Sequence, residues 1–324
     1  MSKEKANYTS IGGQALIEGV MMKGPDKIGI AVRRSDGEIV TKVEEYVPVT
    51  KKHKILSFPV IRGVANFIAM MKLGYSTMMY SAEVAGDEIM EQEEPSKVEK
   101  WISEKFKIDI MDVVMVVGVL LGVGLALFLF MFLPTFLTGL LGKLLTLSDT
   151  VKTVIESLVK MAIFIGYMAS IAYIPDIKRV FAYHGAEHKT IFCYEQGGEL
   201  TPESAKNFSR FHPRCGTNFM TITLLLSILV FMFVGWGNIF LRILLKLCCL
   251  PLIMGISYEL IRIAGKFDNI ITRIISFPGM MIQRITTKEP DEEMLKVAIT
   301  AFKLVAPEYQ SGGERYEEEN VENE

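Results

Sequence analysis

Four apolar stretches divide the chain and predict membrane-spanning helices. The first, residues 113–133, has no charged residue over 21 positions, which is long enough to cross the hydrocarbon core of a bilayer. The second, 158–174, is shorter and holds Lys160 near one end, where the side chain can reach the interface. The third and fourth, 219–234 and 239–261, are separated by a short glycine-containing turn and form a hairpin. The pattern therefore predicts an α-helical polytopic membrane protein with about four spans.

The first 107 residues predict a small α+β region that contains a β-hairpin. Glycines at the start, from position 12 onward, indicate tight turns or close backbone approach. Between 27 and 46, two runs with alternating apolar residues flank Ser35-Asp36-Gly37, and such a pair of runs around a DG sequence is a strong turn signal. Residues 58–80 are apolar with polar positions at near-helical spacing, which fits an interfacial helix or a core helix of this region. The charged stretch 86–107 is expected to be an exposed linker.

The membrane domain, residues 108–265, includes a predicted helical hairpin at 176–218, between spans two and three. One helix would continue span two and end at Gly197-Gly198. Thr201-Pro202-Glu203 would begin the next helix with a cap and a first-turn proline. Such a hairpin could bring distant histidines together beside the membrane.

The part from 266 to 310 predicts an amphipathic C-terminal helix at 292–304. Phe277-Pro278-Gly279 is expected to break the chain before it. The helix has one apolar face, formed by Met294, Leu295, Val297, Ala298, Ala301, Phe302 and Val305. This face would dock on the N-terminal hairpin or on a partner. The tail, 311–324, carries six glutamates and one arginine and predicts a solvated, disordered end.

Composition and charge support a membrane protein and exclude some function classes. The 324 residues are 50% hydrophobic, and the mean hydropathy of +0.31 is too high for an ordinary soluble domain of this size. Lysines and arginines collect before span one, between spans two and three, and after span four, so both termini and the 176–218 hairpin are predicted to be cytoplasmic. The sequence has no secretory signal and its four cysteines form no disulfide framework. It also lacks a phosphate-binding P-loop and a basic, aromatic-rich surface for nucleic acid.

Candidate chemistry concentrates between spans two and three. On a helix, His184 and His188 lie one turn apart on the same face and could hold one ion. With Glu187 they form H-x-x-E-H, the inverted zinc-hydrolase motif, in which the glutamate handles protons. His212 and Cys215 follow in HPRCG and could complete a nitrogen and sulfur site. The alternative is a motif without metal, in which the histidines cap helices and bond to backbone or to headgroup phosphate.

Five motifs carry a resemblance to a known family: GGQALIEGVMMKGP, AVRRSDGEI, YHGAEHKTI, HPRCGTNF and QRITTKEPDEEMLKVAI. Together they run from about residue 11 to 303, and the chain resembles the YqhQ-like family of bacterial membrane proteins. The resemblance implies a multi-pass protein of the bacterial inner membrane. The family carries the label of a predicted metal-dependent enzyme, so the resemblance implies such an activity. It implies no known substrate or reaction.

These features lead to one functional hypothesis with two alternatives. The leading hypothesis is a divalent metal, preferably zinc, on His184, His188 and His212 or Cys215, with Glu187 as general base, in a hydrolase that acts on a peptide or lipid bond at the membrane surface. The first alternative is a scaffold or assembly factor with a structural metal or none, which binds a membrane protein or peptide. A transporter is less favoured, because we expect only Lys246 and Glu259 as charges within the spans, with Glu259 paired to Arg262.

Overall fold

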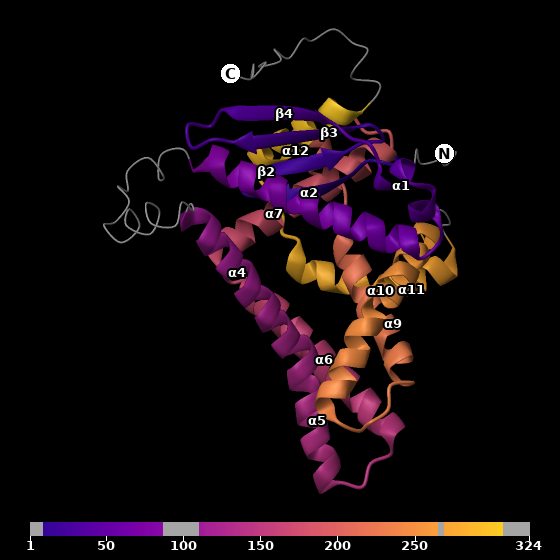
Figure 1. Cartoon of the computed structure of the whole chain (residues 1–324). Coiled ribbons are helices and arrows are strands. Elements are labelled where there is room, and N and C mark those ends of the chain that lie inside the picture. Colours follow the sequence, from indigo (N-terminus) through magenta and orange to yellow (C-terminus); the bar gives the residue numbers. More distant parts are fainter. Residues whose placement is uncertain (1–8, 87–109, 265–268, 307–324) are drawn as a thin grey trace.

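The structure is a computed structural model that describes residues 9–86, 110–264 and 269–306 (Figure 1). All but the first residue of the predicted linker, and the whole acidic tail, lie outside these ranges. Two parts are visible in Figure 1: a layered part built around a β-sheet, and a group of long helices that extends away from it.

Four antiparallel strands form the sheet in the order β1-β2-β3-β4. The strands are β1 (Gly12–Leu16), β2 (Gly19–Lys23), β3 (Lys27–Arg33) and β4 (Ile39–Glu45). The predicted hairpin is confirmed as β3 and β4, and Gly37 N donates to Arg34 O (3.1 Å) in its turn. The glycine-rich start, where tight turns or close backbone approach were expected, forms a second hairpin, β1 and β2.

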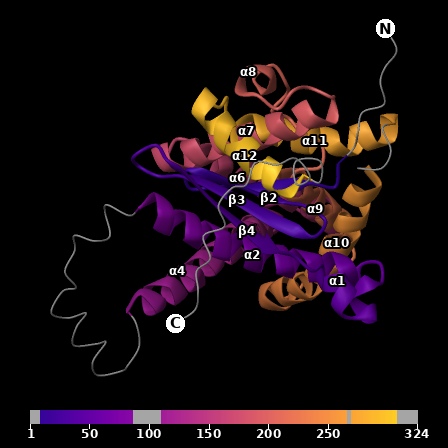
Figure 2. The ribbon, with the colours of Figure 1, turned by 90° about the horizontal axis from the view of Figure 1, so that it is seen from above.

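Strands β2 and β3 are buried on both faces of the sheet, and this burial explains the second hairpin. In β2, Val20 and Met22 pack toward the helices α7 (Pro175–Glu195) and α12 (Glu292–Val305). Met21 packs toward α2 (Ile61–Ala85) on the opposite side. Alternate residues of a strand point to opposite faces, so a short run of apolar residues can fill two layers at once. Figure 2 shows the sheet between these helices.

The C-terminal helix α12 (Glu292–Val305) covers one face of the sheet. Asp291 caps it, accepting a hydrogen bond from Met294 N at 2.8 Å. Strand β3 presents the small residues Gly29 and Ala31 toward α12, so the helix lies close to the strand. The sequence left a choice between the N-terminal region and a partner for this apolar face, and the structure places it on the sheet.

Helix α2 (Ile61–Ala85) covers the opposite face. Met70, Leu73 and Met78 pack against the sheet, as a core helix would. A second set of large apolar side chains is exposed, as on an interfacial helix: Ile61, Ile68, Met71, Tyr75 and Met79. The interpretation as a core helix is therefore confirmed for the side that packs on the sheet, and the interfacial role of the exposed side stays a prediction.

Three helical segments are long and apolar enough to cross a membrane, judged by length and composition among the described residues: Val117–Leu144, Asp149–Ile171 and Ile239–Ile263. The first comprises most of α4 (Ile110–Leu127), a π-helical turn η3 (Phe128–Phe132) and α5 (Leu133–Leu144). The other two are α6 (Asp149–Ile171) and α10 (Ile239–Ala264). The third predicted span, 219–234, corresponds to the shorter apolar helix α9 (Gly216–Phe231).

Two predicted helix boundaries in this bundle are wrong. The first span was expected to end at residue 133, but the helix continues into α5, where Pro134 lies in the first turn and its missing N–H is tolerated. The second span was expected to start at 158, but α6 starts at Asp149 behind the cap Ser148. This earlier start brings Glu156 into the helix bundle.

The predicted helical hairpin at 176–218 is only half helical. Its first arm is α7 (Pro175–Glu195), whereas its second arm is the single turn α8 (Pro202–Ala205), followed by irregular chain up to Cys215. Side chains there bond to nearby backbone, as Asn207 Nδ2 does to Glu203 O (3.0 Å), and Pro213 cannot donate. The expected break at Pro278 is also absent, because α11 (Ile270–Thr286) runs through it.

Candidate metal centre

Helix α7 brings His184 and His188 together beneath the sheet. The two rings lie one turn apart in an edge-to-face arrangement, with their centroids 4.4 Å apart. The surrounding segment of α7 is buried against β1 and α12, and the side chain of His188 is 1% exposed. Gly185 allows this packing, because a Cβ there would clash with the backbone oxygen of Lys288.

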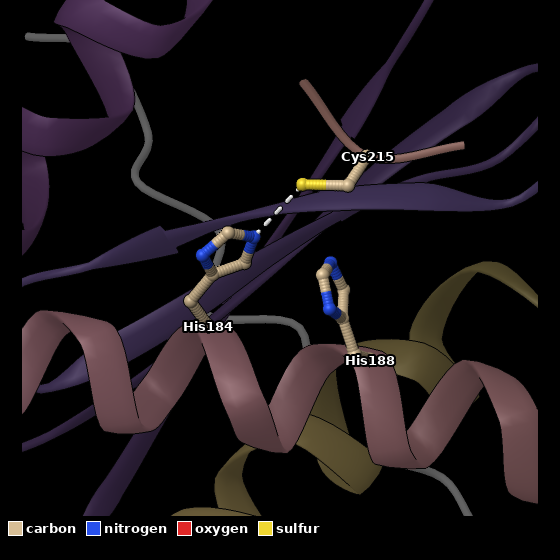
Figure 3. Close-up of side chains that lie close together, drawn as sticks. All are labelled: His184, His188 and Cys215. Carbon is tan, nitrogen blue, oxygen red and sulfur yellow. Dashed lines mark hydrogen bonds between the residues drawn. The ribbon is translucent and has the colours of Figure 1, made fainter. Parts of the chain in front are cut away.

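Cys215 completes a group of three possible ligands. It is the N-cap residue of α9, and its Sγ lies 3.1 Å from His184 Nε2. One ligand atom from each of His184, His188 and Cys215 lies within 4.8 Å of the others. Figure 3 shows the two imidazoles on α7 facing the sulfur. Nitrogen and sulfur donors of this kind suit zinc.

Backbone carbonyls orient both imidazoles. His184 Nδ1 lies 2.9 Å from Thr286 O, and His188 Nδ1 lies 2.6 Å from Arg210 O. A carbonyl oxygen only accepts hydrogen bonds, so each Nδ1 carries the proton, and in the neutral ring Nε2 keeps its lone pair. Metal-binding histidines are typically oriented by such an outer hydrogen bond. Both imidazole rings are therefore held in the tautomer whose Nε2 lone pair can bind a metal.

The three side chains also perturb one another's pKa. Burial alone would raise the pKa of the Cys215 thiol, but His184 and His188 outweigh burial and hold that pKa well below its usual value. Burial alone would lower the pKa of His184, yet the Cys215 thiolate raises it to about 9. In the absence of a metal this arrangement favours a thiolate beside an imidazolium. A thiolate is also the form of cysteine that binds metal.

Glu187 lies next to His184, His188 and Cys215, but it is not one of the three residues whose ligand atoms lie within 4.8 Å of one another. The carboxyl accepts a hydrogen bond from the Gly13 backbone, and burial raises its pKa despite the neighbouring histidines. A Cβ at Gly13 would lie 2.7 Å from Met21 O and 3.0 Å from Glu187 Cδ. The glycine in β1 is therefore needed for the strand to approach α7. The carboxyl can carry a proton near the site or serve as a further ligand.

His212 sits beside the group of three ligands, separated from it by His188, with ring centroids 5.5 Å apart. Its Nδ1 accepts from Arg214 N (3.3 Å), and its Nε2 faces Glu195 at 3.8 Å. The backbone of His212 is held by the Gln283 side chain, which accepts at 2.8 Å and donates at 2.7 Å. Of the four predicted ligands, the structure thus brings three together.

Sequence reasoning missed the residues that support the site. Thr286 and Arg210 act through their carbonyls, which no sequence pattern marks. Glu195 forms an ion pair with Arg214 and accepts from Thr9 N (3.1 Å), so it ties the loop to the N-terminal strand region. The available signal for this residue was an acidic side chain at the end of the predicted helix.

Glu259, which we expected to pair with Arg262, has a different main partner. It accepts two hydrogen bonds from the Arg62 guanidinium, one of them at 2.6 Å from Nε. Arg262 is 4.0 Å away. This ion pair links α10 to α2, and the two helices pack against each other. It lies away from the candidate metal centre and serves packing of the two parts.

Comparison with known proteins places the chain in a family. The family described as "Protein of unknown function (DUF1385)" matches residues 58–308. The chain belongs to this family. A relative from Bacillus subtilis (strain 168), named "Uncharacterized protein YqhQ", is 35% identical over 315 residues, which cover 93% of each chain. The resemblance based on the motifs is therefore confirmed. No solved structure shows a significant match.

Family membership covers both parts of the molecule. The residues matched by the family include α2, α7, the loop to Cys215, α12 and all of the long apolar helices, and the match to the relative covers 93% of the chain. The family and relative descriptions name no activity. The function is therefore best argued from the geometry of the site.

Proposed function

We propose that this chain is a polytopic membrane protein with a metal-dependent hydrolytic centre at the cytoplasmic surface. Membrane placement is supported by the three long apolar helices. It is also supported by α4, whose Leu120 and Leu121 are 66% and 69% exposed and would face lipid. Helix α9, about 24 Å long at 1.5 Å per residue, would supply a fourth crossing. The distribution of lysine and arginine then puts the sheet and both termini inside.

The observation that carries the metal centre is the fixed orientation of its donors. Two imidazoles have their Nδ1 atoms bound to backbone carbonyls, and both turn Nε2 toward one cysteine sulfur. Helix caps or headgroup contacts would not require this convergence inside the protein. Three protein ligands also leave one tetrahedral position open, as in catalytic rather than structural zinc sites.

The chain's own residues fit a hydrolytic role for this centre. A bound zinc ion would supply a water molecule that ionises near pH 7. Glu187, held by the Gly13 backbone, would accept the proton and later deliver it to the leaving group. Because Cys215 begins α9, the centre lies where the sheet part meets the helix bundle. We therefore propose a peptide or lipid bond close to the membrane surface as substrate.

One observation favours a second candidate, a cysteine hydrolase without metal. Cys215 Sγ lies 3.1 Å from His184 Nε2, within the range of a nucleophile and its base, at the N-terminus of a 16-residue helix. In that role the thiolate attacks a carbonyl carbon and forms a thioester, while the His184 imidazolium gives its proton to the leaving group. Water then hydrolyses the thioester with His184 as base.

Metal analysis of the full-length protein, purified in detergent without chelators, separates these functions. We expect about one equivalent of a transition metal in the wild type and in His53→Ala, which changes the exposed fourth histidine. We expect His184→Ala, His188→Ala and Cys215→Ser each to lose most of it. Wild type without metal, together with alkylation of Cys215 faster than that of the exposed Cys248, would favour the cysteine hydrolase. Full occupancy in His184→Ala would refute the metal centre.

A further inference from the structure

A second group of ionisable side chains is buried within the helix bundle. Glu156 of α6 lies at its centre and is 2% exposed. It forms ion pairs with Arg242, at 2.8 Å, and with Lys246, both from α10. Thr135 of α5 donates to the same carboxylate. We call Glu156, Lys160, Arg242 and Lys246 the cationic cluster.

The cationic cluster holds three basic side chains and one acidic one. Arg242 is well accommodated: its Nη1 donates to Val234 O and to Gly235 O (2.9 Å), and its guanidinium lies over the Trp236 ring at 4.0 Å. Lys246 donates to Thr135 (3.0 Å) as well as to Glu156. The carboxylate of Glu156 is thus shared by two cations already.

Lys160 lacks such a partner. Its side chain is buried at 5% exposure, one turn beyond Glu156 on α6. Its ammonium lies over the face of Phe231 at 4.6 Å, and Lys246 lies over the same ring at 5.3 Å. Among the described residues no hydrogen-bond acceptor or carboxylate contacts the Lys160 ammonium. The Lys160 ammonium, which is bound to no acceptor among these residues, therefore adds a third positive charge to a cluster that holds one carboxylate.

The position of the cluster makes this excess costly. Glu156 and Lys160 are seven and eleven residues from the start of α6, or about 10 and 16 Å along the helix. The α5–α6 connection, from which α6 starts, lies at the end of the bundle away from the sheet (Figure 1). An uncompensated charge at such depth costs several kcal/mol. Intramembrane cations are accordingly paired, or mark a ligand site.

We propose that the cationic cluster binds a phosphate-type oxyanion, with Lys160 as its principal ligand. The excess of two positive charges matches a phosphate group, and ammonium N–H donors bind phosphate oxygens well. Phosphates are also the anionic groups that a phospholipid bilayer itself provides. The anion could belong to a lipid headgroup or be free phosphate. The proposal rests on the membrane placement given above but is independent of the metal centre.

The test uses the full-length protein, delipidated in dodecyl maltoside, which contains no phosphate. Its melting temperature is measured with inorganic phosphate, with dioctanoyl phosphatidylglycerol, and with dioctanoylglycerol as the lipid that lacks phosphate. The variant is Lys160→Met, which keeps the length of the side chain and removes its charge. The matched control is Lys152→Met on the same helix, where the lysine pairs with the exposed Asp149.

We expect a phosphate-bearing compound to raise the wild-type melting temperature by about 5 °C or more near saturation, and dioctanoylglycerol to leave it unchanged. A response to phosphatidylglycerol alone would identify the headgroup as the source, and a response to inorganic phosphate would identify the free anion. Lys160→Met should bind at least about tenfold more weakly and, without ligand, melt no lower than wild type, because an unpaired charge is gone. Lys152→Met should respond like wild type.

Three results would overturn the proposal. The first is a wild type that responds to no phosphate compound. The second is a Lys160→Met variant that responds as wild type does. The third is a Lys160→Met variant that melts much lower without any ligand, since Lys160 would then stabilise the bundle itself. Metal content measured on the same samples should be equal in wild type and Lys160→Met. A failure of the anion-binding proposal is therefore distinguishable from a failure of the proposed metal centre.

Discussion

The candidate metal centre and the cationic cluster are both buried groups of ionisable side chains, but they have opposite character. In the metal centre the groups that converge are electron-pair donors: two imidazole Nε2 atoms and a cysteine sulfur, with the Glu187 carboxylate close by. In the cationic cluster the groups that converge are N–H donors, with one carboxylate among three basic side chains. The first group would take up a cation and the second an anion.

The difference shows how a buried polar group can indicate its missing partner. Burial without a partner is unfavourable for a charge of either sign. In both places backbone carbonyls satisfy part of the hydrogen bonding, as Thr286 O does for His184 and Val234 O does for Arg242. The donor or acceptor atoms that have no partner within the protein then indicate the ligand. Their charge gives the sign of the ligand, and their direction gives its position.

Glu156→Gln should have the largest effect, because it removes the only carboxylate of the cationic cluster. Breaking a buried ion pair by removal of one partner typically destabilises by about 3–5 kcal/mol. We therefore expect strongly reduced accumulation in the membrane and a much lower melting temperature. Asp149→Asn, on the exposed end of the same helix, should melt like wild type. A Glu156→Gln variant that accumulates and melts normally would mean that the basic side chains are not charged in the folded protein.

Glu187→Gln tests the opposite group by removing a carboxylate and keeping its shape. The proposed general base is lost while His184, His188 and Cys215 remain, so metal content and melting temperature should stay near wild type. Activity should fall by about 10²–10⁴-fold, the usual contribution of general acid–base catalysis. The measurement is complementation of a deletion strain at matched protein level, together with metal content. Full complementation would support the scaffold, and loss of metal would make Glu187 a ligand.

Sequence reasoning selected the three side chains that converge in the candidate metal centre, because the main signal is local. His184 and His188 are four residues apart on one helix, and that spacing alone fixes their common face. Cys215 was included because it was close in sequence, and so was His212, which the fold places beside the group. The carbonyls of Thr286 and Arg210 could not be predicted, since every residue has a carbonyl and only the fold selects two of them.

The cationic cluster was missed for a related reason. Starting the second span at 158 left Glu156 in a loop, so its pairing with Lys246, 90 positions away, was not considered. The same limitation affected Glu259, whose expected partner was three residues away, whereas Arg62 lies 197 residues earlier. The β3–β4 hairpin and the apolar face of α12 were predictable, because turn chemistry and helical periodicity are local. Long-range pairing of charges is not.

A smaller effect is expected for Gly13→Ala, which tests the support of Glu187. The added Cβ would lie 2.7 Å from Met21 O and 3.0 Å from the Glu187 carboxyl carbon, so β1 must move away from α7. Overpacking of this kind costs about 1–3 kcal/mol. We expect a lower melting temperature and reduced activity with metal still bound. Gly12→Ala is the matched control, because nothing lies within 4 Å of its Cβ position. Equal melting of both variants would show that the strand adapts and that Gly13 does not position the carboxylate.

The smallest effect on metal binding is expected for His212→Asn, which marks the edge of the metal centre. His212 already has a neighbour for each ring nitrogen, Arg214 N for Nδ1 and Glu195 for Nε2, and it lies outside the group of three ligands. Asparagine can still accept from Arg214 N, and the backbone bonds to Gln283 do not depend on the side chain. We therefore expect one equivalent of metal to remain, with an affinity within about tenfold of wild type, since even outer partners of ligands change affinity by about 10–100-fold. Titration against a competing chelator measures this, with Cys215→Ser as the variant that should fail to bind. If His212→Asn loses metal as completely as Cys215→Ser, His212 must swing into the site when metal binds. The centre would then have four protein ligands and the closed coordination typical of a structural zinc site.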